Sequence, residues 1–470
     1  MESPKPLESN LISKLTKLAT KKRIEFWDIR VASSSGTLLE FTNGKNKEVS
    51  YSNIKGAGIR AFINGGWGFS VKQNISDSSI IEGLNEAIKL ALFAERYSKF
   101  KFKIKEYDLI RDKYTTKLKT PLKDVDIEQK IDFALQIEKD AHDFDPRVIN
   151  TNSLYTDGII NSLLINSFGS SIEQSISILR IFSIVYAKEN GNLQRNFESI
   201  GGIGGYELTK KADKIGIKSA KKAIKLLSAK PVKGGKFTVI MDPKLTGVFI
   251  HEAFGHACEA DLVIAKESIL EEKLGEKVAS ENISIIDDPT PSDMALFGSY
   301  KFDDEGIAAK PVQLVENGVL KTYLHDLESA SRMNVSPNGH GRASSYSSKP
   351  QARMGVTYLK EHDWKLNEMI EDTKNGVLCE NWKYGYTNPA TGNFQFKTRN
   401  CYKIENGEKT ELMRDVGLSG LILEILNRVS AIGNKIEYSD GVCGKGGQRV
   451  RNCTGGPYLR VEDVVMGGLQ

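Results

Sequence analysis

The sequence predicts a protein of mixed α and β structure, with an N-terminal α+β domain over residues 1–230 and a mainly antiparallel β-rich C-terminal domain over residues 231–470. The chain has 470 residues, and at about 150 residues per domain this length favours two domains. Helical periodicities alternate with extended runs in the first half. After the turn-forming segment PVKGG, residues 231–235, the chain becomes glycine-rich and β-biased.

In the first 150 residues, apolar side chains recur at helical spacing in three segments and alternate with extended runs. The helices are expected over residues 7–21, 78–97 and 127–142. Residues 25–32 and 36–42 predict a hairpin around Ser33-Ser34-Ser35-Gly36. Residues 56–69 predict a short strand followed by a glycine-dense turn.

Residues 147–199 are rich in β-branched residues, which predicts three or four antiparallel strands. Turn signals divide this segment at Asp157-Gly158, Phe168-Gly169 and Glu189-Asn190-Gly191. A lysine-rich helix is expected over residues 208–227, ahead of the domain boundary. Beyond the boundary, KFTVIM (236–241) predicts a buried strand that leads through Asp242-Pro243 into a helix from Leu245. One further helix is expected near residues 418–428.

The composition is that of an ordinary globular protein, with 40% hydrophobic and 27% charged residues. A net charge of +5 over this length predicts no nucleic-acid or membrane partner. The five cysteines are sparse and odd in number, which favours a reducing compartment over a disulfide framework. The first ten residues are polar, and no run of 18 apolar residues exists. We therefore expect neither a signal peptide nor a transmembrane helix, and a cytoplasmic location.

His251, Glu252 and His256 form an H-E-x-x-x-H pattern inside the segment GVFIHEAFGHACEAD, residues 247–261. Zinc hydrolases need imidazoles on the metal and a carboxylate nearby that takes a proton from water. On an ideal α-helix, histidines five residues apart point about 140° away from each other and cannot share one ion. The pattern therefore predicts a π-type bulge, or a helix end, between them, and Gly255 would permit the distortion. The alternative is a pair of packed core histidines.

Catalytic zinc usually takes three protein ligands, and the residue types leave the third one open. The candidates are Glu259, Asp261, His325, His340 and the cysteines. Cys443 lies in the glycine-rich loop GVCGKGGQ, where a metal would lower the pKa of a thiol, whereas Cys258 could equally be a small buried apolar residue.

The chain resembles the TldD/PmbA family of metallopeptidases over nearly its whole length. The resemblance is carried by HEAFGHACEAD (251–261) and by further blocks in the same order: DDEGIAAKPVQLVENGVL (303–320), GHGRASSYSSKPQARM (339–354), NPATGNFQFKTRNCYKIENGE (388–408), GVCGKGGQ (441–448) and PYLRVEDVVMGG (457–468). The N-terminal GAGIRAFINGGWGF also matches the family pattern. Because the histidine motif is kept, the chain resembles the TldD-like subunit rather than its motif-lacking paralogue.

This resemblance implies one zinc ion per chain, bound by His251, His256 and Cys443, with Glu252 as the general base. The implied mechanism is attack of a zinc-activated water, deprotonated by Glu252, on a scissile carbonyl. Cys453, ten residues after Cys443, is a rival thiol; the GKxGQ context favours Cys443. The family also implies a dimer, either with itself or with the motif-lacking paralogue.

Five further residues are candidates for substrate contacts or for orienting the ligands. Glu259 and Asp261 could orient the histidines. Arg342 and Arg353 could pair with a peptide carboxylate or polarise a carbonyl, or form structural salt bridges. His340, expected on a surface loop, could donate to the tetrahedral intermediate. Asp303 and Asp304 are expected to end a strand with a turn.

The leading hypothesis is a zinc-dependent metallopeptidase that hydrolyses unfolded peptides or small proteins. A second hypothesis is a hydrolase of small amides or dipeptides, which would leave long unfolded chains intact. The third is a non-catalytic metal-binding assembly protein, whose site would be closed by a fourth ligand, Glu259 or Asp261. Glu252 beside His251 argues against the third, because a structural metal needs no base.

Overall fold

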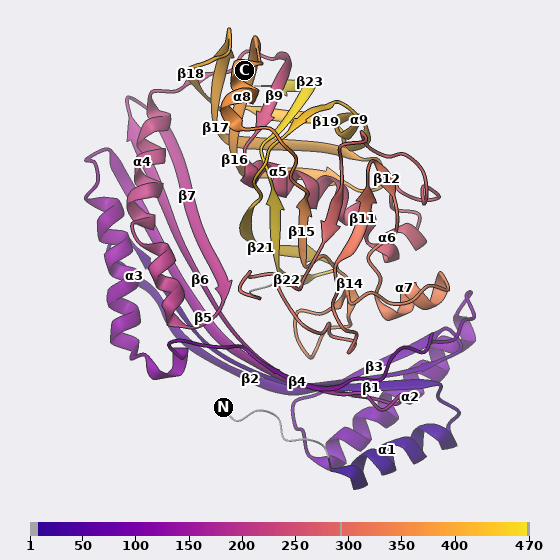
Figure 1. Cartoon of the computed structure of the whole chain (residues 1–470). Coiled ribbons are helices and arrows are strands. Elements are labelled where there is room, and N and C mark those ends of the chain that lie inside the picture. Colours follow the sequence, from indigo (N-terminus) through magenta and orange to yellow (C-terminus); the bar gives the residue numbers. More distant parts are fainter. Residues whose placement is uncertain (1–7, 292–293, 468–470) are drawn as a thin grey trace.

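The structure is a computed structural model that describes residues 8–291 and 294–467. Its N-terminal part is one strongly curved sheet of long strands (Figure 1). The strands run in the order β3-β2-β1-β5-β6, and β6 pairs also with β7 and, in parallel, with β4. Their bounds are β1 Phe26–Thr42, β2 Lys45–Ile63, β3 Gly66–Lys72, β4 Arg111–Thr115, β5 Val148–Asn166, β6 Ser171–Glu189 and β7 Asn192–Ile203.

Helices cover the outer face of this sheet, and the C-terminal half of the chain lies on its inner face (Figure 1). Alternation along β1 explains the two faces, since successive side chains point to opposite sides. Ile29 and Val31 pack in a core with α1 and α2, whereas Asp28 and Arg30 point to the C-terminal half. The helices are α1 Ser9–Lys21, α2 Asp77–Tyr97, α3 Ile127–His142 and α4 Ile215–Leu227, with 3₁₀ turns at Leu122–Asp124 and Tyr206–Ala212.

Two predicted hairpin turns are wrong, because Ser33–Gly36 and Asp157–Gly158 lie in the middle of β1 and β5. These segments face each other, with Gly36 directly opposite Gly158, and a Cβ at Gly36 would collide with the Asp157 carbonyl. The small residues serve this close approach of two strands. The Asp157 carboxylate is buried and accepts a hydrogen bond from the Thr37 backbone N–H.

The other N-terminal predictions hold in most places. The helix predicted over 127–142 coincides with α3, and those predicted over 78–97 and 7–21 correspond to α2 and α1, although Leu7 lies outside the described residues. Phe168-Gly169 and Asn190-Gly191 are turns. The glycine-dense turn is shorter than expected: it is Asn64-Gly65, and Gly66–Phe69 belong to β3. The helix predicted over 208–227 is broken at Lys214, whose φ is +57°.

The C-terminal half contains two larger sheets. The first has six strands in the order β12-β11-β10-β15-β22-β21, and its bounds are β10 Ile285–Asp287, β11 Val312–Glu316, β12 Val319–Leu320, β15 Val356–Leu359, β21 Glu437–Lys445 and β22 Gln448–Gly456. In the second, β16-β9-β23-β19-β17 close into a ring because β17 pairs with β16, while β18, β8 and β20 flank it. Its bounds are β8 Lys230–Pro231, β9 Gly235–Met241, β16 Asn375–Asn388, β17 Asn393–Glu405, β18 Glu408–Arg414, β19 Gly417–Leu421, β20 Val429–Ile432 and β23 Leu459–Gly467. A small ribbon joins β13 Gly341–Arg342 to β14 Gln351–Ala352.

The predicted strand over 236–241 and the helix after it are confirmed as β9 and α5, Pro243–Phe249. Asp242 is the N-cap of α5 and accepts a hydrogen bond from the Leu245 N–H at 2.8 Å. The helix contacts strands of both sheets, and Phe249 stacks edge-on against Phe394 and Phe396. The helix predicted near 418–428 is α9, Ile422–Asn427; the other short helices are α6 Ala260–Ile264, α7 Leu327–Arg332 and α8 Leu366–Glu371.

Buried ion pairs join the N-terminal sheet to the C-terminal half. Arg60 of β2 pairs with Asp28 of β1 and, at 2.7 Å, with Glu305, and all three are buried. Asp303 shapes the turn before Glu305, since its carboxylate accepts the N–H of Glu305, Ile307 and Gly341. The predicted turn at Asp303 and Asp304 is therefore confirmed, but it does not end a strand, because Phe302 forms only an isolated bridge with Ala308. The turn also presents Glu305 to the sheet.

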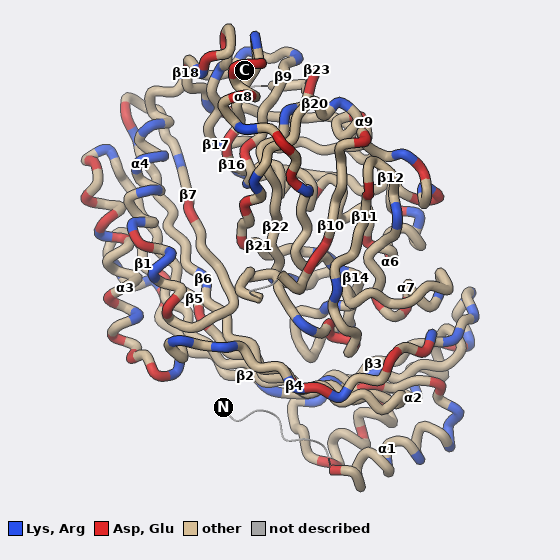
Figure 2. Tube along the Cα trace, in the orientation of Figure 1, with Lys and Arg blue, Asp and Glu red and all other residues tan. Residues whose placement is uncertain are grey.

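The fold is thus mixed α+β with much antiparallel sheet, as predicted; the division into domains 1–230 and 231–470 stays a prediction. Basic and acidic residues are interspersed along most elements (Figure 2). Among the described residues, no helix is both long enough and apolar enough to cross a membrane.

Candidate metal centre

A π-helical turn brings the two motif histidines together, since the His256 N–H bonds to the His251 carbonyl. α5 continues without a break into a π-helical segment, Ile250–Gly255, which contains His251 and is followed directly by His256. In a π-helix the hydrogen bonds join residues five apart, so these residues lie above one another. The distortion predicted from the five-residue spacing is confirmed. Gly255 has ordinary helical dihedrals, and its lack of a side chain is explained by Met354, whose sulfur a Cβ would overlap.

Cys443 completes a cluster with these histidines. One donor atom from each of His251, His256 and Cys443 lies within 4.8 Å of the others, and among the described residues this is the group that could hold a metal ion. The Cys443 Sγ lies 3.3 Å from His256 Nε2. All three side chains are almost completely buried. Cys443 comes from β21, the edge strand of the six-stranded sheet.

The electrostatics of the cluster favour a thiolate. Burial alone raises the pKa of the Cys443 thiol, but the charges and hydrogen bonds of His251 and His256 outweigh it and lower the pKa to about 5. Burial lowers the pKa of His256, whereas Glu259 and Cys443 raise it, and the net effect is a pKa well above the usual value. The cluster therefore favours a Cys443 thiolate with a positive charge, such as a proton on the His256 imidazole, beside it.

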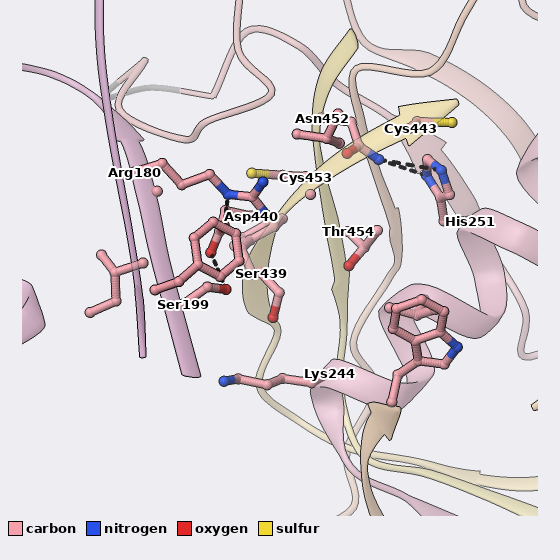
Figure 3. Close-up of a pocket in the computed structure, with 18 of the residues that line it drawn as sticks. Arg180, Ser199, Lys244, His251, Ser439, Asp440, Cys443, Asn452, Cys453 and Thr454 are labelled. Carbon is pink, nitrogen blue, oxygen red and sulfur yellow. Dashed lines mark hydrogen bonds and ion pairs between the residues drawn. The ribbon is translucent and has the colours of Figure 1, made fainter. Parts of the chain in front are cut away.

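Glu252 stands at the edge of the cluster and borders a cleft. Its carboxylate lies 3.8 Å from His256 Nε2, and its side chain is one-third exposed. The cleft has a volume of about 560 Å³. One wall comes from β6 and β7 of the N-terminal sheet, and the other from α5, β21 and β22. Figure 3 shows His251 and Cys443 on one side of this cleft and Arg180 and Ser199 on the other, where both contact Asp440 of β21.

Glu259 orients His256. Its carboxylate lies 2.9 Å from His256 Nδ1, so the other ring nitrogen, Nε2, faces Cys443. Glu259 is fully buried and is compensated by Lys445 at 3.1 Å and, more distantly, by Arg353 at 3.7 Å. Burial would raise the pKa of Glu259, but Lys445 and His256 lower it to about 2. Asp261 contacts Lys445 at 2.7 Å and touches neither histidine through any hydrogen bond found in the described residues.

Asn452 is a site residue that sequence analysis missed. Its side-chain nitrogen lies 3.1 Å from His251 Nδ1 (Figure 3). Asn452 is buried on β22, directly opposite Gly441 of β21. The hairpin register could have found it: Cys443 pairs with Val450, and residues two apart on a strand share a face, so Cys443 and Asn452 point the same way.

The same alternation separates the rival thiol from the cluster. Cys453 points to the opposite face of β22, accepts a hydrogen bond from the Gly298 N–H, and has its pKa raised to about 12, mainly by burial. Cys258 is fully buried in the hydrophobic core, as its apolar alternative predicted. His325 is also buried and lies outside the cluster; burial and His340 lower its pKa to about 4.

Three other candidate residues lie in buried structural contacts. His340 is wholly buried, which corrects its expected place on a surface loop, and it contacts Asp287 at 3.1 Å and the Asn338 carbonyl at 3.0 Å. Arg342 donates to the carbonyl oxygens of Met354 and Arg451. Arg353 lies next to the metal-ligand cluster, where it donates to the carbonyl of Cys443 at 2.8 Å. These three side chains are not part of the cleft wall.

The chain is similar to known proteins along nearly its whole length. Successive parts of the chain match three domains of the PmbA/TldA metallopeptidase family: domain 1 over residues 27–94, the central domain over 120–227 and the C-terminal domain over 234–468. A metalloprotease of Methanocaldococcus jannaschii is 40% identical over 93% of this chain and 96% of its own length. The zinc metalloprotease TldD homolog of Saccharolobus solfataricus is 27% identical, covering 97% of this chain and 99% of the relative.

The solved structures show the same fold at lower identity. TldE from Thermococcus kodakarensis has a TM-score of 0.77 at 18% identity, covering 97% of this chain and all of the relative. A Thermotoga maritima protein described as a modulator of DNA gyrase has the same TM-score at 23% identity, covering 97% of this chain and 99% of the relative. The chain belongs to the TldD/PmbA family of metallopeptidases.

Proposed function

We propose that this protein is a zinc-dependent metallopeptidase that hydrolyses unfolded peptides or small proteins. One observation carries the proposal. Cys443, from a distant part of the chain, meets His251 and His256 beside Glu252 at the edge of a cleft. Zinc metalloprotease is also the name given to the Saccharolobus relative.

The donor set fits zinc. Two imidazoles and a thiolate are ligands that zinc accepts in four-coordinate sites, and a soft thiolate favours zinc over manganese or magnesium. The positive charge that the cluster favours between Cys443 and His256 is one that a metal cation supplies. Within the described parts of the chain the cluster holds three donors rather than four, which supports a catalytic site with an open position and speaks against the closed site of an assembly protein.

Bound zinc would supply Lewis acidity, which polarises a carbonyl and makes water a nucleophile at neutral pH. Glu252 is placed to take the proton from the attacking water, because its carboxylate is beside the cluster and open to the cleft. As the C–N bond breaks, the same carboxyl group can return the proton to the leaving nitrogen. Glu259 fixes the His256 ring, and Asn452 contacts the His251 ring.

The proposal assigns supporting roles to the remaining candidates. Arg353 and Lys445 neutralise Glu259, and Asp261 helps to hold Lys445. Arg342 and His340 stabilise the surrounding loops through the contacts described above.

We also propose a cytoplasmic protein that forms a dimer, with itself or with a motif-lacking paralogue. The TldE structure supports the second possibility only in showing that a protein of that name shares this fold. The mass in solution, compared with 52.1 kDa per chain, decides between monomer and dimer.

The test is elemental analysis of protein purified without added metal, combined with an assay on unfolded peptides. We expect about one zinc per chain in the wild type, and loss of zinc in His251→Ala and Cys443→Ala. Cys453→Ala is the matched control, because it removes a buried thiol from the same hairpin on its other face. It should keep its zinc.

Glu252→Gln separates metal binding from catalysis. We expect it to keep zinc and to lose peptide cleavage by at least about 100-fold, the usual contribution of a general base. Full zinc in Cys443→Ala would refute the ligand assignment, and undiminished cleavage by Glu252→Gln would refute the role of the base. Cleavage of dipeptides alone would favour the small-amide hydrolase.

A further inference from the structure

The cleft beside the metal-ligand cluster carries more positive than negative charge. Among the described residues, five basic and three acidic side chains line it. Arg180 is neutralised by Asp440, whose carboxylate lies 2.6 Å from the guanidinium and bridges β6 to β21. Of the other two acidic groups, Glu252 lies at the cluster and Glu198 on β7. Neutralisation of the other four cations of the cleft wall therefore rests on Glu198 and on any anion that enters the cleft.

Glu198 is already engaged by two lysines, of which only Lys222 lies outside the cleft wall among the described residues. Its carboxylate makes a close ion pair with Lys222 of α4, at 2.6 Å, and a looser one with Lys244 of α5, at 3.4 Å. Lys244 keeps 39% of its side chain exposed. Figure 3 shows Lys244 extending from α5 at the edge of the cleft. A second carboxylate could therefore bind Lys244 without displacing Glu198.

Arg399 of β17 is a buried cation that lacks a carboxylate partner within 4 Å in the described part of the chain. Its guanidinium donates to the carbonyl oxygens of Trp382 and Phe197 and lies 3.3 Å from the centre of the Phe197 ring. Burial lowers its pKa to about 10, although Glu198 acts in the opposite direction. Asp242 also lies near, but its carboxylate is occupied by the N–H groups of Leu245 and Asn381. Buried charges without partners are costly, so an anionic ligand is favoured here.

Two exposed cations, Lys211 and Arg449, also line the cleft. Neither forms an ion pair with any residue that the structure describes. Because exposed charges are well solvated, each contributes less than a buried one. They do raise the concentration of anions in and around the cleft.

The helical segment that begins with α5 sets the distance between Lys244 and the reaction centre. Lys244, Val248 and His251 all line the cleft and follow the i, i+4, i+7 pattern of one helix face. Seven residues of helix span about 10 Å. An extended peptide advances about 3.3 Å per residue, so the same distance corresponds to about three residues of substrate.

We propose that the cleft contains a carboxylate-binding subsite, formed by Lys244 and Arg399, which holds a carboxylate of an extended peptide about three residues from the scissile bond. The carboxylate is either an Asp or Glu side chain or the C-terminal group of the peptide. This inference rests on the proposed peptidase function and specifies the substrates that it selects.

The test measures binding of fluorescent peptides to the Glu252→Gln protein, so that the peptides stay intact. One series moves a single Glu along an otherwise neutral peptide, each member paired with its Gln counterpart. A second series compares C-terminal acids with amides. We expect one Glu position, or the free C-terminus, to bind about tenfold more tightly than its neutral counterpart, with the difference shrinking at high salt.

Adding Lys244→Gln should abolish the preference, and adding Lys244→Glu should transfer it to peptides that carry Lys. Lys221→Gln is the matched control, since Lys221 is an exposed lysine of α4 outside the cleft wall, and it should leave the preference intact. A preference for Glu at one position identifies a side chain as the source, and a preference for the acid over the amide identifies the C-terminus.

The subsite is refuted if no acidic peptide binds more tightly than its neutral counterpart, including the case in which no peptide binds, or if Lys244→Gln leaves the preference unchanged. Failure of the proposed function is a different result. In that case the wild-type protein, reconstituted with zinc, would bind the peptides and leave them uncut.

Discussion

At the scale of single residues, the candidate site could be predicted where a chemical pattern lies in one short segment. His251, Glu252 and His256 are close in sequence, so their chemistry could be inferred directly. The third donor lies 187 residues beyond His256, and residue type alone left nine candidates. Only the resemblance singled out Cys443 before the structure placed it beside the histidines.

The register of the β21–β22 hairpin holds information that the sequence analysis did not use. Gly446 and Gly447 both have positive φ and form a two-residue turn between Lys445 and Gln448. Counting back from this turn places Cys443 and Asn452 on one face and Cys453 on the other. By contrast, nothing in the sequence indicates that His340 and Arg342 are buried, because their partners come from remote segments.

Glu259→Gln is expected to weaken zinc binding about 10–100-fold, because a carboxylate that orients a metal-bound histidine also increases its basicity. The measurement is competition for zinc against a chelator of known affinity. Asp261→Asn is the control, since Asp261 contacts Lys445 but not His256. Equal zinc affinities in the wild type and Glu259→Gln would limit Glu259 to neutralising Lys445 and Arg353.

At the scale of secondary structure, long periodic segments were predicted well and turns less so. The amphipathic pattern of α3 fixed both of its ends, whereas Ser33–Gly36 and Asp157–Gly158 have turn composition for a different reason. They lie where the paired strands β1 and β5 approach closely, a tertiary constraint that local composition does not report. The π-helical turn was predictable because two ligands on one ion impose a geometric condition on their spacing.

Gly255→Ala tests how tightly the π-helical turn is packed. The added methyl group would overlap the sulfur of Met354, and we expect a loss of about 1–3 kcal/mol in the free energy of unfolding. In a Met354→Ala background the loss should be smaller, because the overlap is gone and alanine is the better helix former by about 1 kcal/mol. Urea denaturation of the four proteins gives the coupling.

Gly444→Ala is the matched control for that cycle, because a Cβ at Gly444 would meet open space. It should change the free energy of unfolding by less than about 0.5 kcal/mol. If Gly255→Ala costs the same with and without Met354, the glycine serves the conformation of the turn rather than its packing.

At the scale of the whole molecule, the cleft exists only because the N-terminal sheet and the C-terminal half are held together. The contact at Arg60 contains more carboxyl groups than cations. Burial raises the pKa of Glu305 to about 7, although Arg60 acts to lower it. Burial and Glu305 together raise the pKa of Asp303 well above its usual value.

The free energy of unfolding should therefore fall as the pH rises from about 5 to 8. The folded protein holds the Glu305 proton more tightly than the unfolded chain does, so stability is greatest below the ordinary pKa of 4.5 and is lost as the pH passes about 7. The change attributable to this group is on the order of 3 kcal/mol. Glu305→Gln should flatten the pH profile in denaturant titrations.

Glu281→Gln is the control for the pH profile, because Glu281 is highly exposed and forms a surface ion pair with Lys277. Its profile should follow that of the wild type. A Glu305→Gln profile as steep as the wild-type profile would show that another group titrates in this range.

The separation of the proposed ligands along the chain has a consequence for protein synthesis. Chains emerge from the ribosome N-terminus first and begin to fold as they do. His251 and His256 emerge long before Cys443, which becomes available only once β21 has been made and has paired with β22. While most of its second half is being made, the growing chain thus has the histidine motif but lacks the Cys443 thiolate. Under the proposed mechanism, the nascent chain therefore has no peptidase activity until β21 has paired with β22.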